Sequence, residues 1–455
     1  MKNQLIIVAG AIVATALASV LNAKIQEKHP LNTTGLRNNT TTEGRSISEN
    51  KPQQKEEPAA PKCVFMTAFE GKGIDKVESY PLPEQVVRSM DRGMDWLVYA
   101  QNQDGGWGAG AHSRQDIRDP HAVKSDPATT AMVAMAIHRE GNTLQNGPHA
   151  SKLKEATLYL LLAVESAQQN DLNITQLTGT QPQNKLGKNI DVVLTSQYLG
   201  NLLRDIKNDQ AMYQRVKTAI SKCVNMISRG QSADGSQHGS GWAGVLQSSF
   251  ATSALETAKE AGVAVEEDVL DRSREFQKKN VNVKTNEVAT DAAAGIVLYS
   301  ASGSARASAK ETAEAKQIIA KAKKEGKISN SEVNMDNLRK AGVEEEKALK
   351  YNTAYQVNKA AKRIAQDDEV ITGFGNNGGE EFLSYLQTGE GLIVGNDQDW
   401  KSWYDKTSAR LIGIQNNDGS WSGHHCITSP VFCTATCLLI LSVSNDIEHL
   451  KADNR

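Results

Sequence analysis

A turn motif that recurs along the chain constrains its fold more than any other feature. It reads Gln-x-x-Asp-Gly-x-Trp in QNQDGGW (residues 101–107) and QNNDGSW (residues 415–421), while GQSADGSQHGSGW (residues 230–242) keeps Gln, Asp-Gly and a later Trp. Asp-Gly forms tight turns, Trp can pack across a junction, and Gln can bond exposed backbone at a helix end. The motif therefore predicts a repeated structural corner. The tryptophans expected at equivalent corners are Trp107, Trp242 and Trp421.

Each copy of the motif separates a half-buried helix from a fully buried one. Residues 86–101 carry apolar side chains on one helical face and charged side chains opposite, which predicts a half-buried helix. Residues 128–137 are apolar or small nearly all round, with Asp126 as the expected N-cap and Pro127 in the first turn. Buried helices of the same kind are expected at residues 250–258 and 432–441. Weaker helix pairs are expected at residues 151–167 with 189–206, and at 267–278 with 287–301.

Two concentric rings of helices satisfy this alternation, because inner helices are covered on both sides and outer helices face water on one. We therefore predict an all-α fold, an α/α toroid, over residues 63–446. Residues 302–348, rich in Lys, Glu and Ala, are expected to form a charged, solvated helical insertion in it. Residues 447–455 are expected to form a tail.

The clean motifs resemble the QW repeats of the terpenoid cyclase and protein prenyltransferase toroid superfamily. The resemblance covers roughly residues 80 to 445 and is closer still to the exported bacterial prenyltransferase and squalene oxidase repeat proteins. It implies the toroid fold but not one chemistry, because unrelated activities share this fold.

The catalytic motifs of that superfamily are incomplete in this chain. Hopene-type cyclases use an Asp-x-Asp-Asp acid, which neither residues 365–370 nor residues 396–400 complete. The zinc site of prenyltransferase β-subunits corresponds to Asp291, Ala293 and Cys433 here, so two of its three ligands differ. Thioester domains need a Gly-Cys-Gly-Glu-Gln sequence, which the chain lacks.

The N-terminus has the pattern of an export signal. Residues 5–21 are apolar, a Lys precedes them, and Ala23 could end a signal peptide over residues 1–23. The same apolar run could instead remain as a membrane anchor. Residues 24–62 hold few large apolar side chains and are expected to form a disordered linker. We therefore expect the rest of the chain to be exported to the periplasm or cell envelope.

A His- and Cys-rich stretch follows the last turn. His424, His425, Cys426 and Cys433 could supply nitrogen and sulfur ligands to zinc, although their spacing matches no zinc template. The alternative is a structural role, in which the histidines line a loop and Cys433 and Cys437 pack as small apolar groups. We expect this structural role.

Two further segments hold candidate site residues near the same end of the toroid. The loop of residues 112–126 offers His112 and Arg114 for binding. Asn376 and Asn377, in a Gly-rich turn, could also bind a ligand, and the Glu380 and Glu381 that follow suit a positive helix start. The candidate acid, base or nucleophilic residues are Asp116, Asp119, His121 and His424.

These features predict a binding or scaffold protein of the cell envelope, with a hydrophobic, glycan or protein ligand. The alternative is an enzyme with unfamiliar residues at the toroid mouth, acting on an isoprenoid, lipid or glycan. Nucleic acid is not an expected partner, because the formal net charge of -2 creates no attractive field for it.

Overall fold

The computed structural model describes residues 80–375, 377–395 and 397–445. Within these ranges the chain is helical, and extended pairing is limited to isolated bridges, which confirms the all-α prediction. The predicted signal or anchor, the linker and the tail lie outside these residues. No helix in the described ranges is long and apolar enough to cross a membrane.

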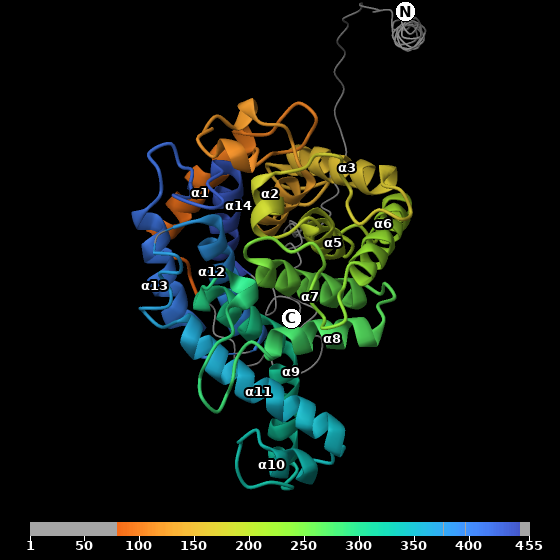
Figure 1. The fold of residues 1–455 in the computed structure, drawn as a ribbon, viewed down its shortest axis with the longest axis vertical. Helices are drawn as coiled ribbons and strands as arrows, with labels where there is room; N and C mark the ends of the chain where they lie inside the picture. Colours follow the sequence, from red (N-terminus) through yellow and green to blue (C-terminus); the bar gives the residue numbers. More distant parts are fainter. Residues whose placement is uncertain (1–79, 376, 396, 446–455) are drawn as a thin grey trace, which may run out of the picture. The chain divides into compact units, whose positions relative to one another are not determined.

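Six long helices form an inner ring in this part of the chain. Each contacts the next in the order α2, α5, α7, α9, α12 and α14, and α14 contacts α2 again, so the ring closes around the centre of Figure 1. Every residue of α2, α5, α12 and α14 is buried, and for α2 and α14 their apolar or small composition predicts this. The inner helices are α2 (Pro127–Arg139), α5 (Ile190–Leu202), α7 (Gly244–Glu260), α9 (Val297–Lys324), α12 (Gly379–Val394) and α14 (Pro430–Leu441).

Six half-buried helices pack on the outside of this ring (Figure 1). Outer and inner helices alternate along the chain, because each turn returns it from one layer to the other. The outer helices are α1 (Glu84–Tyr99), α3 (Ala150–Ser166), α6 (Gln210–Arg229), α8 (Glu267–Lys278), α11 (Glu345–Ala365) and α13 (Trp400–Gly413). The shorter helices are α4 (Gln181–Lys185), α10 (Met335–Lys340), η3 (His112–Arg114), η4 (Pro120–Ala122) and η5 (Asp291–Ala293).

Helix starts follow the local sequence at the first buried helix. The Asp126 carboxylate accepts a hydrogen bond from the Thr129 N–H, and Pro127 occupies the first turn, as predicted. The helix expected at residues 287–301 instead begins at Val297, because residues 287–296 form a loop with a short 3-10 turn at η5.

The Trp of the clean motif joins an outer helix to the next inner helix. Trp421 is fully buried, and its indole Nε1 donates to the Leu411 carbonyl at the end of α13 at 2.8 Å. Its backbone N–H donates to the Thr434 hydroxyl of α14, also at 2.8 Å. Trp107 makes the same two kinds of bond, to α1 and α2. Burial of the indole and both hydrogen bonds therefore hold each corner.

Trp242 does not occupy the equivalent corner of the third copy, so that prediction is wrong. Its side chain is 67% exposed, whereas Gln237 is buried and its N–H donates to the Ser248 hydroxyl of α7. Gln237 stands six residues after Gln231, the spacing that separates Gln and Trp in the clean copies. The Trp242 side chain therefore takes no part in the packing of this corner.

The last corner attaches to the first outer helix and closes the toroid. The Gln415 amide donates to the Ser89 carbonyl of α1 at 2.9 Å and accepts from the Ser89 hydroxyl. Gly419 has a φ of 96°, and a Cβ there would lie 2.5 Å from the Arg92 carbonyl oxygen, so only glycine fits this approach. In the first copy, the Gln101 side-chain amide likewise donates a hydrogen bond to the Lys152 carbonyl of α3.

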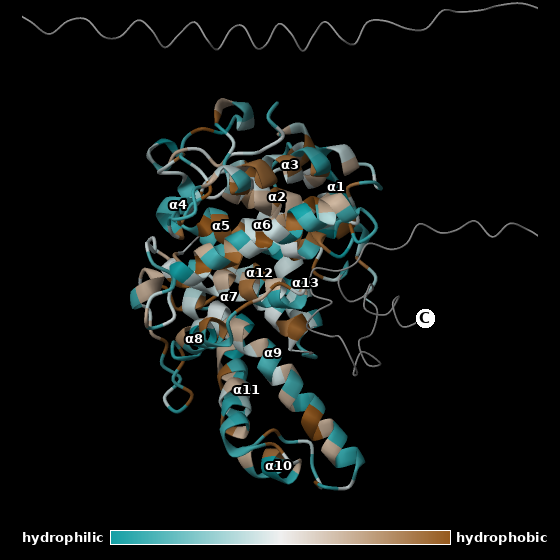
Figure 2. Ribbon diagram, turned by 90° about the vertical axis from the view of Figure 1, so that its right-hand side faces the viewer, coloured by the Kyte–Doolittle hydropathy of each residue, from teal (hydrophilic) through white to brown (hydrophobic). Residues whose placement is uncertain are grey.

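The predicted charged insertion begins later than expected. Residues 302–309 of α9 are buried in the inner ring, so the prediction of a solvated segment from residue 302 is wrong there. Small residues such as Ser302 and Ser308 allow this burial, since their hydroxyls and short chains fit between helices. The remainder of α9, with α10 and α11, forms an arm that extends from the ring in Figure 2 and has its own small core.

A buried ion-pair network links four of the inner helices to one another and to an outer helix. The Arg306 guanidinium lies 3.2 Å from a Glu256 carboxylate oxygen and 3.6 Å from one of Glu390. Glu390 also pairs with Arg139 at 3.1 Å, and Glu256 pairs with Arg274 at 2.7 Å. These five charges come from α9, α7, α12, α2 and α8, so the network connects helices distant in sequence. Mutual pairing offsets the cost of burying them.

Replacing Trp421 by Ala should destabilise the fold by about 3 to 5 kcal/mol, because the change empties a buried site and removes the bond to α13. Chemical denaturation of Trp421→Ala measures the free energy of unfolding. Trp242→Ala is the matched control and should change it little, because that ring is exposed. Equal effects of the two substitutions would contradict the corner role of Trp421.

Candidate functional site

The loops that lead into the inner helices meet at one end of the ring, called the mouth here. The Gln181 side-chain oxygen accepts from the Thr428 N–H at 2.7 Å, and the Arg118 guanidinium donates to the Thr428 carbonyl at 3.0 Å. The Gly379 N–H donates to the Ile427 carbonyl at 3.0 Å. These bonds connect segments that precede α2, α5, α12 and α14, so residues far apart in sequence share the mouth.

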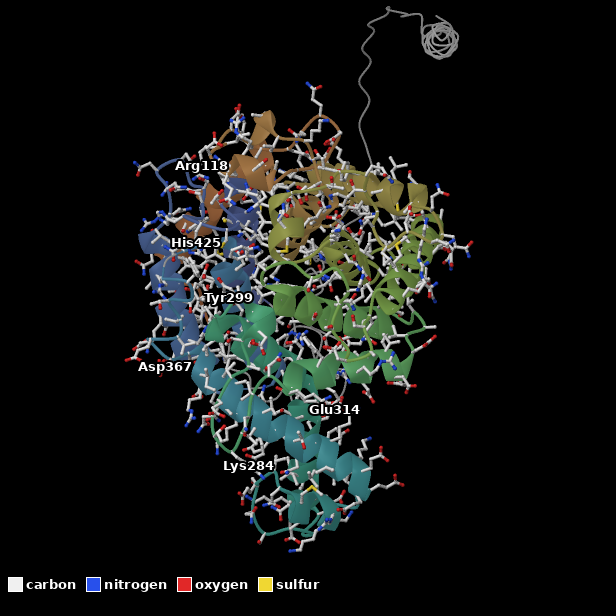
Figure 3. The ribbon with its side chains drawn as sticks, in the orientation of Figure 1. Arg118, Lys284, Tyr299, Glu314, Asp367 and His425 are labelled. Carbon is white, nitrogen blue, oxygen red and sulfur yellow. The ribbon has the colours of Figure 1, made fainter. Side chains whose placement is uncertain are left out.

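Six polar side chains from α4, α9, the start of α12 and the loop before α14 form the mouth cluster. Its members are Lys185, Tyr299, Glu380, Glu381, His425 and Cys426. Figure 3 labels two of them, His425 from the loop before α14 and Tyr299 from α9, together with the nearby Arg118. The cluster combines carboxyl, phenol, imidazole, thiol and ammonium groups, so it holds proton donors and acceptors at one place.

Glu381 is the central acceptor of the mouth cluster. It is fully buried, and its Oε1 accepts hydrogen bonds from the Tyr299 hydroxyl at 2.5 Å and the Phe374 N–H at 3.0 Å. The His425 Nε2 lies 3.8 Å from its Oε2. Burial, followed by the adjacent carboxylate, raises the pKa of the Tyr299 hydroxyl, which therefore stays a donor. Glu381 thus ties α9 and the 373–375 loop to the start of α12.

Glu380 is buried beside Glu381 in the first turn of α12. Its Oε2 accepts from the Ile427 N–H at 3.2 Å. Burial, and then repulsion from Glu381, raises the pKa of Glu380 to about 7. The partial positive charge of the helix start favours carboxylates at this position. Near neutral pH this carboxyl can therefore hold or release a proton.

Lys185 connects the cluster to an exposed aromatic ring. Its side chain is buried, and the ammonium lies 4.4 Å from the centre of the Trp242 ring. Burial and Glu380 raise the pKa of the Cys426 thiol to about 12, although Lys185 opposes this shift. The thiol is therefore protonated at neutral pH and is a weak nucleophile in this state.

Cys426 has a strained backbone. Its φ of 60° lies in the left-handed region that non-glycine residues seldom adopt. The Ile427 N–H and carbonyl, bonded to Glu380 and Gly379, hold the chain on its C-terminal side. On the other side, the His424 N–H donates to the Asn377 carbonyl. Strain of this kind is maintained by the surrounding contacts and is frequent at functional sites.

Among the residues predicted as catalytic, a direct contact within the described ranges joins Asp119 and His121. Asp116 is exposed and paired with Arg114, whose hydrogen bonds lower the pKa of the Asp116 carboxyl. Asp119 caps the turn at η4 by accepting from the His121 N–H, and the His121 ring packs edge-on against Tyr99. His424 is exposed on a separate loop. Each candidate has its own local role on the surface.

The residues predicted to bind or to hold a metal divide into two groups. His425 and Cys426 belong to the mouth cluster, and the His112 ring lies close enough to Lys185 for that charge, after burial, to lower its pKa. Cys433 is buried and its thiol donates to the Ile427 carbonyl, while Asn376 lies outside the described residues. Across the ranges that the structure describes, no three His, Cys, Asp or Glu side chains are arranged as metal ligands.

Sequence reasoning missed several members of the site. Lys185 lies in a polar stretch without a motif, and Tyr299 lies in the first turn of α9, which begins ten residues later than the sequence predicts. Glu380 and Glu381 were recognised only as residues that suit a helix start. The available signal was their adjacency: two neighbouring carboxylates directly before the apolar stretch Phe382–Leu383 indicate an acidic pair at the start of a helix.

No protein-family model and no curated protein sequence matches the chain. Among solved structures, it is similar to the type II terpene cyclase MstE from Scytonema without ligand, at 11% identity and a TM-score of 0.42, over 81% of this chain and 100% of that chain. A variant of MstE in complex with geranylgeranyl dihydroxybenzoate gives 12% identity and a TM-score of 0.42, over 80% and 98%.

Glu380 should make the stability of the fold depend on pH. Its pKa rises from 4.5 to about 7, so between these values the folded chain keeps a proton that the unfolded chain loses. This contribution is fully present below pH 4.5 and is lost as the pH rises through 7, by at most about 1.4 kcal/mol per pH unit. Denaturation of Glu380→Gln between pH 4.5 and 7.5 should show a flatter profile.

The control for this measurement is Glu84→Gln, which alters an exposed carboxylate on α1. It should keep the slope of the unaltered protein. If Glu380→Gln keeps that slope as well, Glu380 is ionised throughout this range and the assigned proton is wrong.

Proposed function

We propose that this chain is an exported protein of the cell envelope that binds a ligand at the mouth of its toroid. The observation that carries the proposal is the pair of exposed aromatic rings beside the mouth cluster: Trp242 is 67% exposed and Phe374 is 58% exposed. Rings of this size are normally buried when their role is structural, as Trp107 and Trp421 are. Exposed aromatic residues beside convergent polar groups are typical of binding sites.

The contacts of the cluster support binding rather than catalysis as its main role. The carboxylates of Glu380 and Glu381 are engaged by protein donors, namely the Ile427 and Phe374 N–H groups and the Tyr299 hydroxyl. These bonds hold the loops of the mouth in place. The proposal of export rests on the N-terminal sequence pattern, and nucleic acid is not a proposed partner.

One observation favours an enzyme as the second candidate function. Glu380 has a pKa of about 7 beside a second carboxylate, which suits a general acid that transfers a proton near neutral pH. In that case Glu380→Gln would abolish turnover but leave ligand binding in place. A binding protein would show no turnover with or without this substitution.

Hydrogen–deuterium exchange of the purified chain tests the binding function. Envelope extract of the source organism would be separated into a lipid fraction and a water-soluble saccharide fraction, and each would be added to the protein. A ligand that covers the mouth should slow exchange in residues 238–243, 371–375 and 422–429, because it excludes water and limits opening of these loops.

The double variant Trp242→Ala with Phe374→Ala should lose this protection while keeping the exchange pattern of the inner helices. Protection that appears only on the α9–α11 arm, or protection that survives in the double variant, would place the ligand elsewhere. Failure of every fraction to protect any segment would contradict the binding function.

A further inference from the structure

We infer that the mouth takes an extended, uncharged saccharide, with Trp242 and Phe374 as stacking platforms and the polar groups between them as partners for hydroxyls. The inference rests on the proposed binding function and adds the class of ligand. It depends on how the two rings are held, on what lies between them, and on the charge of the site.

Trp242 is supported from behind. The Lys185 ammonium lies 4.4 Å from the ring centre on one face, and 67% of the residue remains exposed, so the other face is open. Lys185 is itself held by its burial. A cation over one face of an indole attracts the ring electrostatically and limits its movement. The open face is therefore a positioned, flat apolar surface.

Phe374 is also held by contacts with the cluster. Its backbone N–H donates to Glu381, and its ring packs on the His425 imidazole with ring centres 5.2 Å apart. The residue is nevertheless 58% exposed. Trp242 is thus linked to Lys185, whose charge acts on Cys426, and Phe374 is linked to His425, the chain neighbour of Cys426. The two platforms therefore border one polar strip.

The strip between the rings offers donors and acceptors that a ligand can reach. The His425 side chain is 21% exposed, and Cys426 is partly exposed. The Glu381 Oε2 is buried, has no hydrogen-bond partner among the residues that the structure describes, and lies 3.8 Å from the His425 Nε2. A hydroxyl or water bound at this point could satisfy that oxygen, which would otherwise be costly to bury.

A saccharide matches this combination better than an isoprenoid chain. A pyranose ring has an apolar face of C–H groups, which pack on the negative face of an aromatic ring, and an edge of hydroxyls that need hydrogen-bond partners. Two separate platforms with a polar strip between them fit two sugar units of one chain. An isoprenoid would leave the groups of the strip without partners, at a cost in free energy.

The charge of the site favours a neutral sugar. Lys185 and Glu381 supply opposite charges, and the Glu380 carboxyl is partly protonated near neutral pH. A strongly anionic or cationic ligand would meet no matching excess of charge here. Specificity must therefore come from shape and hydrogen bonds rather than from charge.

The experiment is affinity electrophoresis of the purified full chain through gels that contain soluble neutral polysaccharides, with laminarin, xylan and dextran in separate gels. At least one should retard the protein, and Trp242→Ala and Phe374→Ala should each weaken that binding by about tenfold, because each removes one stacking platform. Trp242→Tyr should restore most of it. Tyr99→Ala is the matched control, since Tyr99 is 70% exposed but lies outside the cluster, and it should bind normally.

Parallel measurements use phosphatidylcholine vesicles that contain farnesol. Binding to these vesicles, without retardation by any polysaccharide, would overturn the saccharide class but keep a ligand-binding mouth. Retardation that all three alanine variants share would place saccharide binding elsewhere and overturn the inference. If neither probe binds, the saccharide inference fails, and the exchange experiment with envelope fractions decides independently whether the mouth binds a ligand.

Discussion

The hydrogen bonds of the last corner to the first outer helix are the contacts on which the rest of the structure depends. Each corner joins one outer helix, the next inner helix and the following outer helix, and at Gln415 the following outer helix is α1. The chain thereby returns to its start, and the ring order of the inner helices closes between α14 and α2. Without this closure, an inner helix at each end would expose an apolar face to water.

Closure also determines where the chemistry of the protein lies. The loops before α2, α5, α12 and α14 are brought to one end, so side chains more than two hundred residues apart, such as Gln181 and Thr428, become neighbours. Helix starts carry partial positive charge, which favours the buried carboxyls of Asp126, Asp191 and Glu380 there. Their burial raises their pKa values, to about 8 for Asp191 and about 7 for Glu380. The polar character of the mouth is therefore a consequence of the ring.

The third copy of the motif differs from the two clean copies, and this difference leaves a Trp available for the proposed ligand binding. Gln237 takes the buried position that Trp occupies in the clean copies, and it keeps the backbone bond to α7. Trp242 stands five residues later, outside the corner, over Lys185. A residue type that elsewhere holds two helix layers together is here exposed at the mouth. One motif thus supplies both the scaffold and a candidate platform for a ligand.

Local sequence determined the helical class, the alternation of half-buried and buried helices, the Asp126 cap and the two clean corners. These features depend on periodicity, turn residues and caps, which act over a few positions. The tertiary structure decided which helices neighbour one another, that Gln237 replaces Trp242, and that α9 continues in the ring. It also decided the mouth cluster, because Lys185, Tyr299 and Glu381 meet only when loops distant in sequence converge. No local pattern encodes such a contact, since its energy appears only on closure of the ring.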